Sequence, residues 1–497
     1  MKRTVPAAVV ILAYLSSRIL TFSTFHPWWA GDSGGYAGPF AAAWSGQAAL
    51  IDGARPPIYP IVLGISQLLR NDVPSAALSL ATAAMVTRAQ ALVALFALSA
   101  LYWLARRGFS MSRAASCVAV AAVGVFLPIA VYDRIILTES LGTSLLILSA
   151  ATIFGTEVLH TSVSVVGRWL GGAAAGAIWA AAVLTRPNFI AAVAILLMFS
   201  LVHDPHGEAW PARVTARCTW LLRRIYRRLK VFAVPLVTSA VLVGSWIAFN
   251  GVNTGYAKIS NYEGISLTGV CYDCMDAVEA DYPVFARIMA DLNRGHEAAG
   301  SAKTDVIQEA LPQIFAAADA GNIPGLSCCG GKRIADLNAY IGRATRAAIV
   351  KRPASYVRHV LSNIVSMPII TTDWVVSKTA IDPRAPGAEG SVIKREPLML
   401  QTAPVVRVMD RLGTFLLVVF YLLPLILLSR STRRRIPYYA IAIWCAIVAM
   451  NLACCLVAPW FPRYSVPTLP LCLVVTFAVL AEFFADRYVG SIAHRDP

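Results

Sequence analysis

Long apolar stretches divide the 497-residue chain and leave few ways for it to fold. A helix that crosses the hydrocarbon of a bilayer needs about 20 apolar residues. The chain is 57% hydrophobic and 14% charged, whereas a soluble domain carries about 25% charged residues. We therefore predict an all-α polytopic membrane protein with about ten transmembrane helices, and at most about 11–13. The predicted spans lie at 5–25, 85–105, 114–131, 140–154, 169–184, 189–202, 231–250, 408–428, 438–458 and 466–484.

The excess of positive charge has a topological explanation. The 43 Lys+Arg against 27 Asp+Glu give a formal net charge of +16, which in a soluble protein suggests nucleic acid. In a membrane protein, basic residues instead gather in cytoplasmic loops. An inner N-terminus places the basic clusters in inner loops, so we expect membrane lipids and no nucleic acid as partners. The clusters are Arg106, Arg107 and Arg113, then Arg223, Arg224, Arg227, Arg228 and Lys230, and finally Arg430, Arg433, Arg434 and Arg435.

Three regions follow from this topology. Residues 1–250 form a predicted N-terminal transmembrane module with a first outer loop at 26–84. Residues 251–407 mix acidic, basic and helix-periodic stretches, which predicts a small α-rich outer domain. Residues 408–497 return to apolar spans and end in a short inner tail. The outer segments are expected to hold the function, because irregular backbone in a membrane protein is tolerated where it meets water.

Four cysteines lie in the predicted outer domain. They are grouped as a Cys-x-x-Cys pair, Cys271 and Cys274, and as a neighbouring pair, Cys328 and Cys329. Zinc is one reading, but an oxidising compartment favours disulfides, and adjacent cysteines are poorly spaced for one tetrahedral site. The simplest expectation is two bridges that join the first pair to the second, although spacing alone does not determine the pairing.

Acidic and basic side chains stand next to the outer ends of the first spans. Asp32 follows the first span, Arg55 precedes Pro56 and Pro57, and Glu139 opens the fourth span. Each has an alternative structural role. Asp32 is a suitable helix N-cap, Glu139 suits a helix dipole, and Arg55 is a suitable interfacial anchor that extends to lipid headgroups.

Further arginines belong to the same predicted membrane face. Arg186 closes the fifth span, and Arg463 precedes the last one. Arg18 lies within the first span, where an unpaired charge at mid-membrane costs about 2.5–3.5 kcal/mol, although it is near enough to the outer end to reach the headgroups. Acids and arginines that converge at one face are what a phosphate-bearing lipid substrate requires.

These short motifs, in this order, resemble a family of membrane enzymes. The chain is similar to the GT-C class of integral-membrane glycosyltransferases, and within it to the protein mannosyltransferase and aminoarabinose transferase branch. The resemblance spans nearly the whole chain, but it does not account for the outer segment with four cysteines. The motifs are Asp32 with Tyr36, Arg55-Pro56-Pro57, Leu137-Thr138-Glu139-Ser140-Leu141, Leu184-Thr185-Arg186-Pro187, Pro462-Arg463-Tyr464, and the stretch from Ile349 to Tyr356 with Pro353.

The resemblance implies a GT-C type fold and an inverting glycosyltransferase that uses a polyprenyl-phosphate sugar donor. Its acceptor would be a lipid, glycan or protein hydroxyl on the periplasmic face of a bacterial inner membrane. By carry-over, Asp32 is the catalytic base that takes the proton of the acceptor. Arg55 is the first choice for stabilising the phosphate of the donor, and Arg463 and Arg186 are weaker candidates.

The remaining implied site residues have supporting roles. Glu139 is the second catalytic acid, which would orient the acceptor, a basic residue or a metal. Tyr36 and Tyr59 would line the substrate pocket, although tyrosine is common at membrane interfaces. No cofactor follows from the sequence. A divalent cation held by Asp32 and Glu139 is an open alternative, because enzymes of this class differ in metal use.

Two other classes of function stay open. A transporter or flippase of lipid-linked saccharides would place ionisable residues near the bilayer midplane, often within repeated halves. This chain places them at the outer ends and shows no repeat, which favours an enzyme. A ligase or polymerase that moves a whole glycan from a diphosphate carrier would also use outer loops with acids and arginines.

Overall fold

The structure is a computed structural model of the 497-residue chain. It describes residues 5–24, 27, 33–46, 55–76, 78–162, 164–202, 214–299, 306–323, 326, 333–370, 397–427, 438–458 and 462–493. Within these ranges the regular structure is helical and no strand occurs. The prediction of an all-α chain is confirmed for this part of the sequence.

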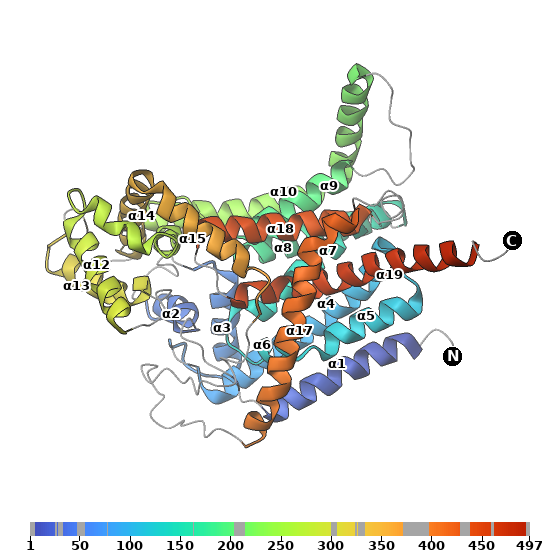
Figure 1. Cartoon of the computed structure of the whole chain (residues 1–497), viewed down its shortest axis with the longest axis horizontal. Coiled ribbons are helices and arrows are strands. Elements are labelled where there is room, and N and C mark those ends of the chain that lie inside the picture. The colour runs from blue at the N-terminus through green and yellow to red at the C-terminus, as the bar shows by residue number, and fades with distance from the viewer. Residues whose placement is uncertain are drawn as a thin grey trace.

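Among the described residues, ten helices form a bundle, with a second group of helices at one end and both chain termini at the other (Figure 1). We call these the domain end and the terminal end. Most bundle helices run between the two ends, and α17 crosses them obliquely. The bundle helices are α1 (Val5–Thr24), α4 (Leu80–Trp103), α5 (Arg113–Val125), α7 (Thr138–Ser162), α8 (Val165–Thr185), α9 (Phe189–Val202), α10 (Val214–Thr254), α17 (Pro397–Leu427), α18 (Tyr438–Val457) and α19 (Leu469–Ala493).

Six helices are long and apolar enough to cross a membrane, judged by length and composition over the described residues. Four shorter apolar helices, of 10–17 residues, accompany them. Each predicted span except the third falls mainly on one helix, while the total of about ten spans stays a prediction. The six are Leu80–Gly108, Thr138–Thr156, Cys218–Thr254, Pro404–Leu425, Tyr438–Val457 and Tyr464–Glu482.

The third predicted span, 114–131, is wrong as one continuous helix. The chain breaks between α5 and the short α6 (Leu127–Tyr132). Pro128 explains the break, because proline has no N–H for the carbonyl four residues earlier and its ring clashes with that carbonyl. The carbonyl concerned belongs to Gly124, and it accepts a hydrogen bond from Arg18 Nη1 of α1 at 2.8 Å instead.

Serine side chains fix the start of several bundle helices. The hydroxyls of Ser79, Ser112 and Ser164 accept hydrogen bonds from the backbone N–H groups three residues later, at the starts of α4, α5 and α8. Serine is among the best N-cap residues, because its oxygen satisfies an N–H that has no partner inside the helix. These caps set where each bundle helix begins.

Helix α7 is enclosed by the rest of the bundle. Its candidate span is 83% buried, whereas that of α10 is 17% buried, so α10 lies at the periphery. Helix α7 packs against α4, α8, α9 and the 3₁₀ segment η6 (Pro462–Thr468). Helix α7 therefore lies among four other segments of the bundle.

The segment after α10 has a hydrophobic core separate from that of the bundle. Helix α15 (Pro353–Ser366) leads back to the bundle, where Tyr356 Oη donates to the Leu456 carbonyl of α18 at 2.7 Å. The predicted region boundaries at 250 and 407 fall inside α10 and α17, and the bounds stay predictions. The other helices of this segment are α11 (Glu263–Thr268), η2 (Tyr272–Val278), α12 (Pro283–Ala299), α13 (Val306–Asp319) and α14 (Arg333–Lys351).

Candidate functional site

Three of the predicted motif segments meet at the start of α7. Glu139, in the first turn of α7, is 3% exposed. Arg186, the C-cap residue of α8, places Nη1 3.5 Å from Glu139 Oε1. The ring of Tyr464, in η6, lies 5.5 Å from the Arg186 guanidinium carbon. The structure thus joins the Thr-Glu, Thr-Arg-Pro and Pro-Arg-Tyr motifs in one place.

The Arg186 side chain fits there because α7 has a glycine beneath it. A Cβ on Gly142 would lie 3.1 Å from Arg186 Cδ and 3.3 Å from the Phe189 ring. Arg186 Nη1 makes no hydrogen bond within the described part of the chain, so its contact with Glu139 is an ion pair. A guanidinium carries five N–H donors in a fixed fork, which suits a carboxylate or phosphate. The group can therefore hold an anion in addition to Glu139.

A second group of side chains surrounds Arg55. The guanidinium carbon of Arg55 lies 4.7 Å from the ring centroids of both Tyr36 and Tyr262. Arg55 Nη1 also donates to Tyr36 Oη at 3.5 Å. Cation–π contacts of this kind orient a guanidinium without using its N–H donors. Tyr36 comes from α2 (Ser33–Trp44) and Tyr262 directly precedes α11, so the segment between α10 and α15 contributes to this group.

Tyr59 connects the Arg55 group to the start of α7. Its ring meets the Tyr36 ring edge to face, with centroids 5.3 Å apart. Its hydroxyl donates to Gln90 Oε1 of α4 at 2.6 Å, and Gln90 Nε2 donates to the Ile135 carbonyl, in the turn before α7, at 3.2 Å. Tyr59 is fully buried at the start of α3 (Ile58–Leu69). Because this hydroxyl is already bonded to Gln90, the role of Tyr59 is to hold the neighbouring Tyr36 ring in place, and not to bind a ligand through its hydroxyl.

Some predicted site residues lie beyond what the structure describes. Asp32 is outside the described residues and directly precedes α2 in the sequence. Arg463 belongs to η6, but its side chain is outside the description. Cys328 and Cys329 are also outside it. The catalytic role of Asp32 and the phosphate contact of Arg463 therefore stay predictions.

The expected pairing of the outer cysteines is wrong for the first pair. Cys271 forms a disulfide with Cys274, three residues away, and not with the second pair. Both residues are buried in the separate core, at the start of η2, whose tight 3₁₀ turn brings the two cysteines together. The prediction of a disulfide is confirmed for this pair, but it closes a local turn and does not link two distant segments.

Asp273, inside that disulfide turn, attaches it to α15. Its carboxylate accepts from Ser355 Oγ at 3.0 Å and contacts His359 Nε2 at 3.0 Å. Partial burial raises the pKa of Asp273, but the hydrogen bond and charge of His359 and the bond from Ser355 outweigh it and lower the pKa below its ordinary value. Asp273 lies between the serine and the histidine, so this is an anchoring contact and not a nucleophile–base relay.

Arg18 is paired within the bundle and does not extend to headgroups. Its Nη2 lies 2.6 Å from Asp133 Oδ2, and Nε donates to the same oxygen at 2.8 Å. Ser140 Oγ donates to the other carboxylate oxygen at 2.5 Å. Arg18 is 6% exposed and Asp133 is 1% exposed. This pair fixes α1 against the loop that precedes α7, and it accounts for both side chains structurally.

Sequence reasoning missed two members of these groups. Tyr262 lies in the outer segment, and no local pattern distinguishes it from other tyrosines. Asp133 stands in the Asp133-Arg134 turn before α7, and the charge of Arg18 within a predicted span was the signal that could have pointed to a nearby acid. Among the described residues, no group of three or more His, Cys, Asp or Glu side chains is arranged to hold a metal ion.

The helical fold and the apolar helices define a helical membrane protein. Its candidate site lies where the start of α7, the end of α8, η6 and the Arg55 group approach one another. Comparisons of the chain with protein-family models, with curated proteins and with solved structures give no match.

Proposed function

We propose that the protein is a GT-C type inverting glycosyltransferase that moves a single sugar from a polyprenyl-phosphate donor to an acceptor hydroxyl. The observation that carries this proposal is the convergence of two arginine-centred groups, Arg186 with Glu139 and Arg55 with its tyrosines, linked through Tyr59. Arginine suits phosphate because its planar donors match phosphate oxygens bidentately. The proposed site faces the periplasm of a bacterial inner membrane.

Each step of the proposed reaction has a residue to serve it. The acceptor oxygen forms a bond to the anomeric carbon from the face opposite the donor phosphate, and its proton passes to the carboxylate of Asp32. The bond from the anomeric carbon to the phosphate oxygen breaks, and the lipid phosphate leaves with increased negative charge. Arg55 stabilises this charge, since its guanidinium is held between Tyr36 and Tyr262 before the reaction.

Glu139 has a positioning role in this proposal. Of its three candidate roles, orienting a basic residue agrees with its ion pair with Arg186. Arg186 Nη1 makes no hydrogen bond within the described residues, which leaves a donor for an anionic ligand. Arg186 and Arg463 would thus assist Arg55 at the phosphate, while Tyr36 contacts the sugar.

The test uses the full-length protein, purified in lipid nanodiscs, with a panel of polyprenyl-phosphate sugars. The donor is first identified by comparing lipid-linked sugars and surface glycans in cells with and without the gene by mass spectrometry. Asp32→Asn should abolish transfer, and Arg55→Ala should raise the KM for the donor about tenfold or more, because a charge-assisted contact contributes about 1.5–3 kcal/mol. The exposed residues Asp291 and Arg70 supply matched controls, Asp291→Asn and Arg70→Ala.

Two outcomes would refute the proposal. Donor lipid that crosses the bilayer without any new glycosidic bond would identify a transporter or flippase. Transfer of a whole glycan from a diphosphate carrier would identify a ligase or polymerase. Near-normal turnover by Asp32→Asn would remove Asp32 as the base, and an unchanged donor KM in Arg55→Ala would remove Arg55 from the phosphate.

A further inference from the structure

Helix α10 changes direction near the terminal end of the bundle. Its first part stands off the bundle, while its apolar part runs along the other long helices (Figure 1). Pro235 lies inside the helix just after this change. A proline in a helix interior removes one backbone hydrogen bond and bends the helix. The bend therefore has an identifiable cause in the sequence.

The part of α10 before the bend is amphipathic. Leu222, Tyr226 and Leu229 are exposed and recur at helical spacing. Each of these apolar residues is followed directly by an exposed cation, so a basic row runs parallel to the apolar row. The cations are Arg223, Arg227 and Lys230. An apolar stripe next to a basic stripe is typical of a helix that lies in the plane of a membrane surface. The direction of this part, across the bundle helices, agrees with such a position.

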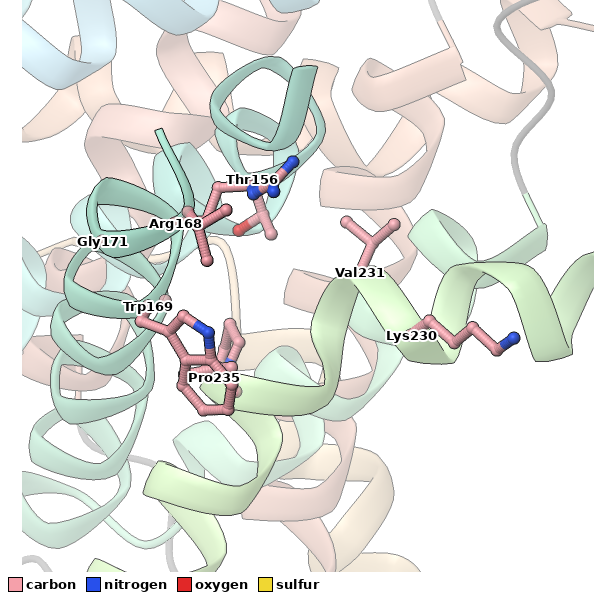
Figure 2. Close-up of a pocket in the computed structure, with 10 residues that line it drawn as sticks. Thr156, Arg168, Trp169, Gly171, Lys230, Val231 and Pro235 are labelled. Atoms are coloured by element: carbon pink, nitrogen blue, oxygen red, sulfur yellow. The ribbon is translucent and has the colours of Figure 1, made fainter. Parts of the chain in front are cut away.

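A pocket of about 270 Å³ opens at the bend, between the terminal ends of α7, α8 and α10. Arg168 of α8 and Lys230 of α10 are its two cations, and Trp169 lines its apolar side. Figure 2 shows the Arg168 guanidinium beside Thr156, and the Lys230 ammonium directed outward along the helix. Arg168 thus lies inside the pocket. Lys230 lies at the rim and its ammonium turns away from Arg168, with Nζ 4.5 Å from the centroid of the Tyr226 ring.

Close helix packing limits the depth of this pocket. A Cβ on Gly172 would lie 3.0 Å from Val234, and one on Gly176 would lie 2.3 Å from the Pro235 carbonyl oxygen. Helices α8 and α10 therefore touch through these glycines toward the domain end, and they separate toward the terminal end, where Trp169 and Arg168 lie. The pocket is consequently closed toward the bundle interior and open toward the terminal side.

We propose that this pocket binds the phosphate headgroup of an anionic phospholipid in the leaflet at the terminal end. Arg168 contacts the phosphate, Lys230 contributes charge at the rim, and the acyl chains lie along the apolar side next to Trp169. Arg168 already has at least one other interaction, and its five N–H donors allow it to be shared. Basic pockets between membrane helices on the cytoplasmic side are suited to anionic headgroups. This site is separate from the proposed transfer site and does not depend on it.

Native mass spectrometry of the full-length protein in detergent tests the proposal with phosphatidylglycerol and phosphatidylcholine as probes. We expect retention of phosphatidylglycerol in preference to phosphatidylcholine. Removing both charges in Arg168→Gln/Lys230→Gln should weaken phosphatidylglycerol binding about 25-fold, or about fivefold for each cation. The charge-preserving variant Arg168→Lys/Lys230→Arg should retain most of the binding. The melting temperature of each variant reports whether it folds.

The matched control is Arg107→Gln/Arg113→Gln, which removes two exposed charges that are also predicted at the terminal side. It should leave the binding unchanged. Equal weakening by this control, or equal retention of both lipids by the unmodified protein, would overturn the proposal. Displacement of phosphatidylglycerol by millimolar inorganic phosphate would also overturn it, since the same cations would then serve a free phosphate ion.

Discussion

The buried pair of Arg18 and Asp133 allows a quantitative prediction. The Asp133 carboxylate receives two contacts from Arg18 and one from Ser140, and both charged side chains are almost fully buried. Asp133→Leu would leave the guanidinium with Ser17 Oγ and the Gly124 carbonyl as its polar partners within the described residues. Removing one partner of a buried ion pair costs about 3–5 kcal/mol, because the other charge remains without its counter-charge.

The double variant Arg18→Met/Asp133→Leu separates the cost of an unpaired charge from the net contribution of the ion pair to the free energy of unfolding. Replacement of both charges by apolar side chains is often close to neutral. We therefore expect the double variant to lie within about 2 kcal/mol of the unmodified protein and to be more stable than Asp133→Leu alone. As a control, Asp291→Leu removes an acid from an exposed ion pair with Arg294, and its effect should stay below about 1 kcal/mol.

The assay follows unfolding through buried thiols. Cys117, Cys454, Cys455 and Cys472 are free and buried, so in a background with Cys218→Ser and Cys445→Ser a thiol-reactive fluorophore labels them only when the bundle opens. Unfolding curves in one detergent, recorded for the two single variants and the double variant, give the coupling energy of the cycle. If the double variant loses the sum of the two single losses, the charges are not coupled and the reasoning fails.

Three further predictions concern other contacts. Asp273→Asn should lower the melting temperature at neutral pH, and its difference from the unmodified protein should shrink below about pH 4. The pKa of Asp273 is lower in the folded protein than in the unfolded chain. The ionised carboxylate therefore contributes its full stability above the unfolded-state pKa, and this contribution is lost as the pH falls through the folded-state pKa. A pH series of melting curves checks this, and a constant difference would contradict it. Tyr262→Ala should raise the KM for a phosphate-bearing donor about threefold to fivefold, while Tyr262→Phe keeps the ring over Arg55 and should have little effect; equal behaviour of the two variants in steady-state kinetics would count against the contact. Gly142→Val should displace Arg186, because a Cβ already lies 3.1 Å from Cδ, and should lower transfer more than it lowers the melting temperature; unchanged transfer would show that the position of Arg186 is not needed.

For the site residues that lie at helix ends, the sequence was enough to predict that they belong to the same end of the bundle. Glu139, Arg186 and the Pro-Arg-Tyr motif each adjoin a predicted span, so topology alone puts them on one side of a membrane. Their contact in the structure then depends on how α7, α8 and η6 pack. Pro128 likewise marked the break in the third stretch, although the stretch reads as continuously apolar.

Long-range pairings could not be predicted in the same way. Tyr262 reaches Arg55 across more than 200 positions in the sequence, through packing of the separate core and not through a local pattern. The partner of Cys271 depends on whether the chain turns tightly after it, which the sequence spacing leaves open. The sequence left open whether Arg18 reaches the headgroups or has a counter-charge, and composition gave no way to choose among the acids of the predicted outer segments.

The pairing of Arg18 with Asp133 also has a consequence for synthesis. The two residues are 115 positions apart, and a ribosome adds about 5–20 residues per second. The first helix is therefore made roughly 6–23 s before its counter-charge exists. During that interval α1 carries an unpaired guanidinium that costs about 2.5–3.5 kcal/mol at mid-membrane, so we expect the helix to stay where Arg18 reaches the headgroups or beside the insertion machinery. Its final depth in the bilayer would be set only when the turn before α7 emerges.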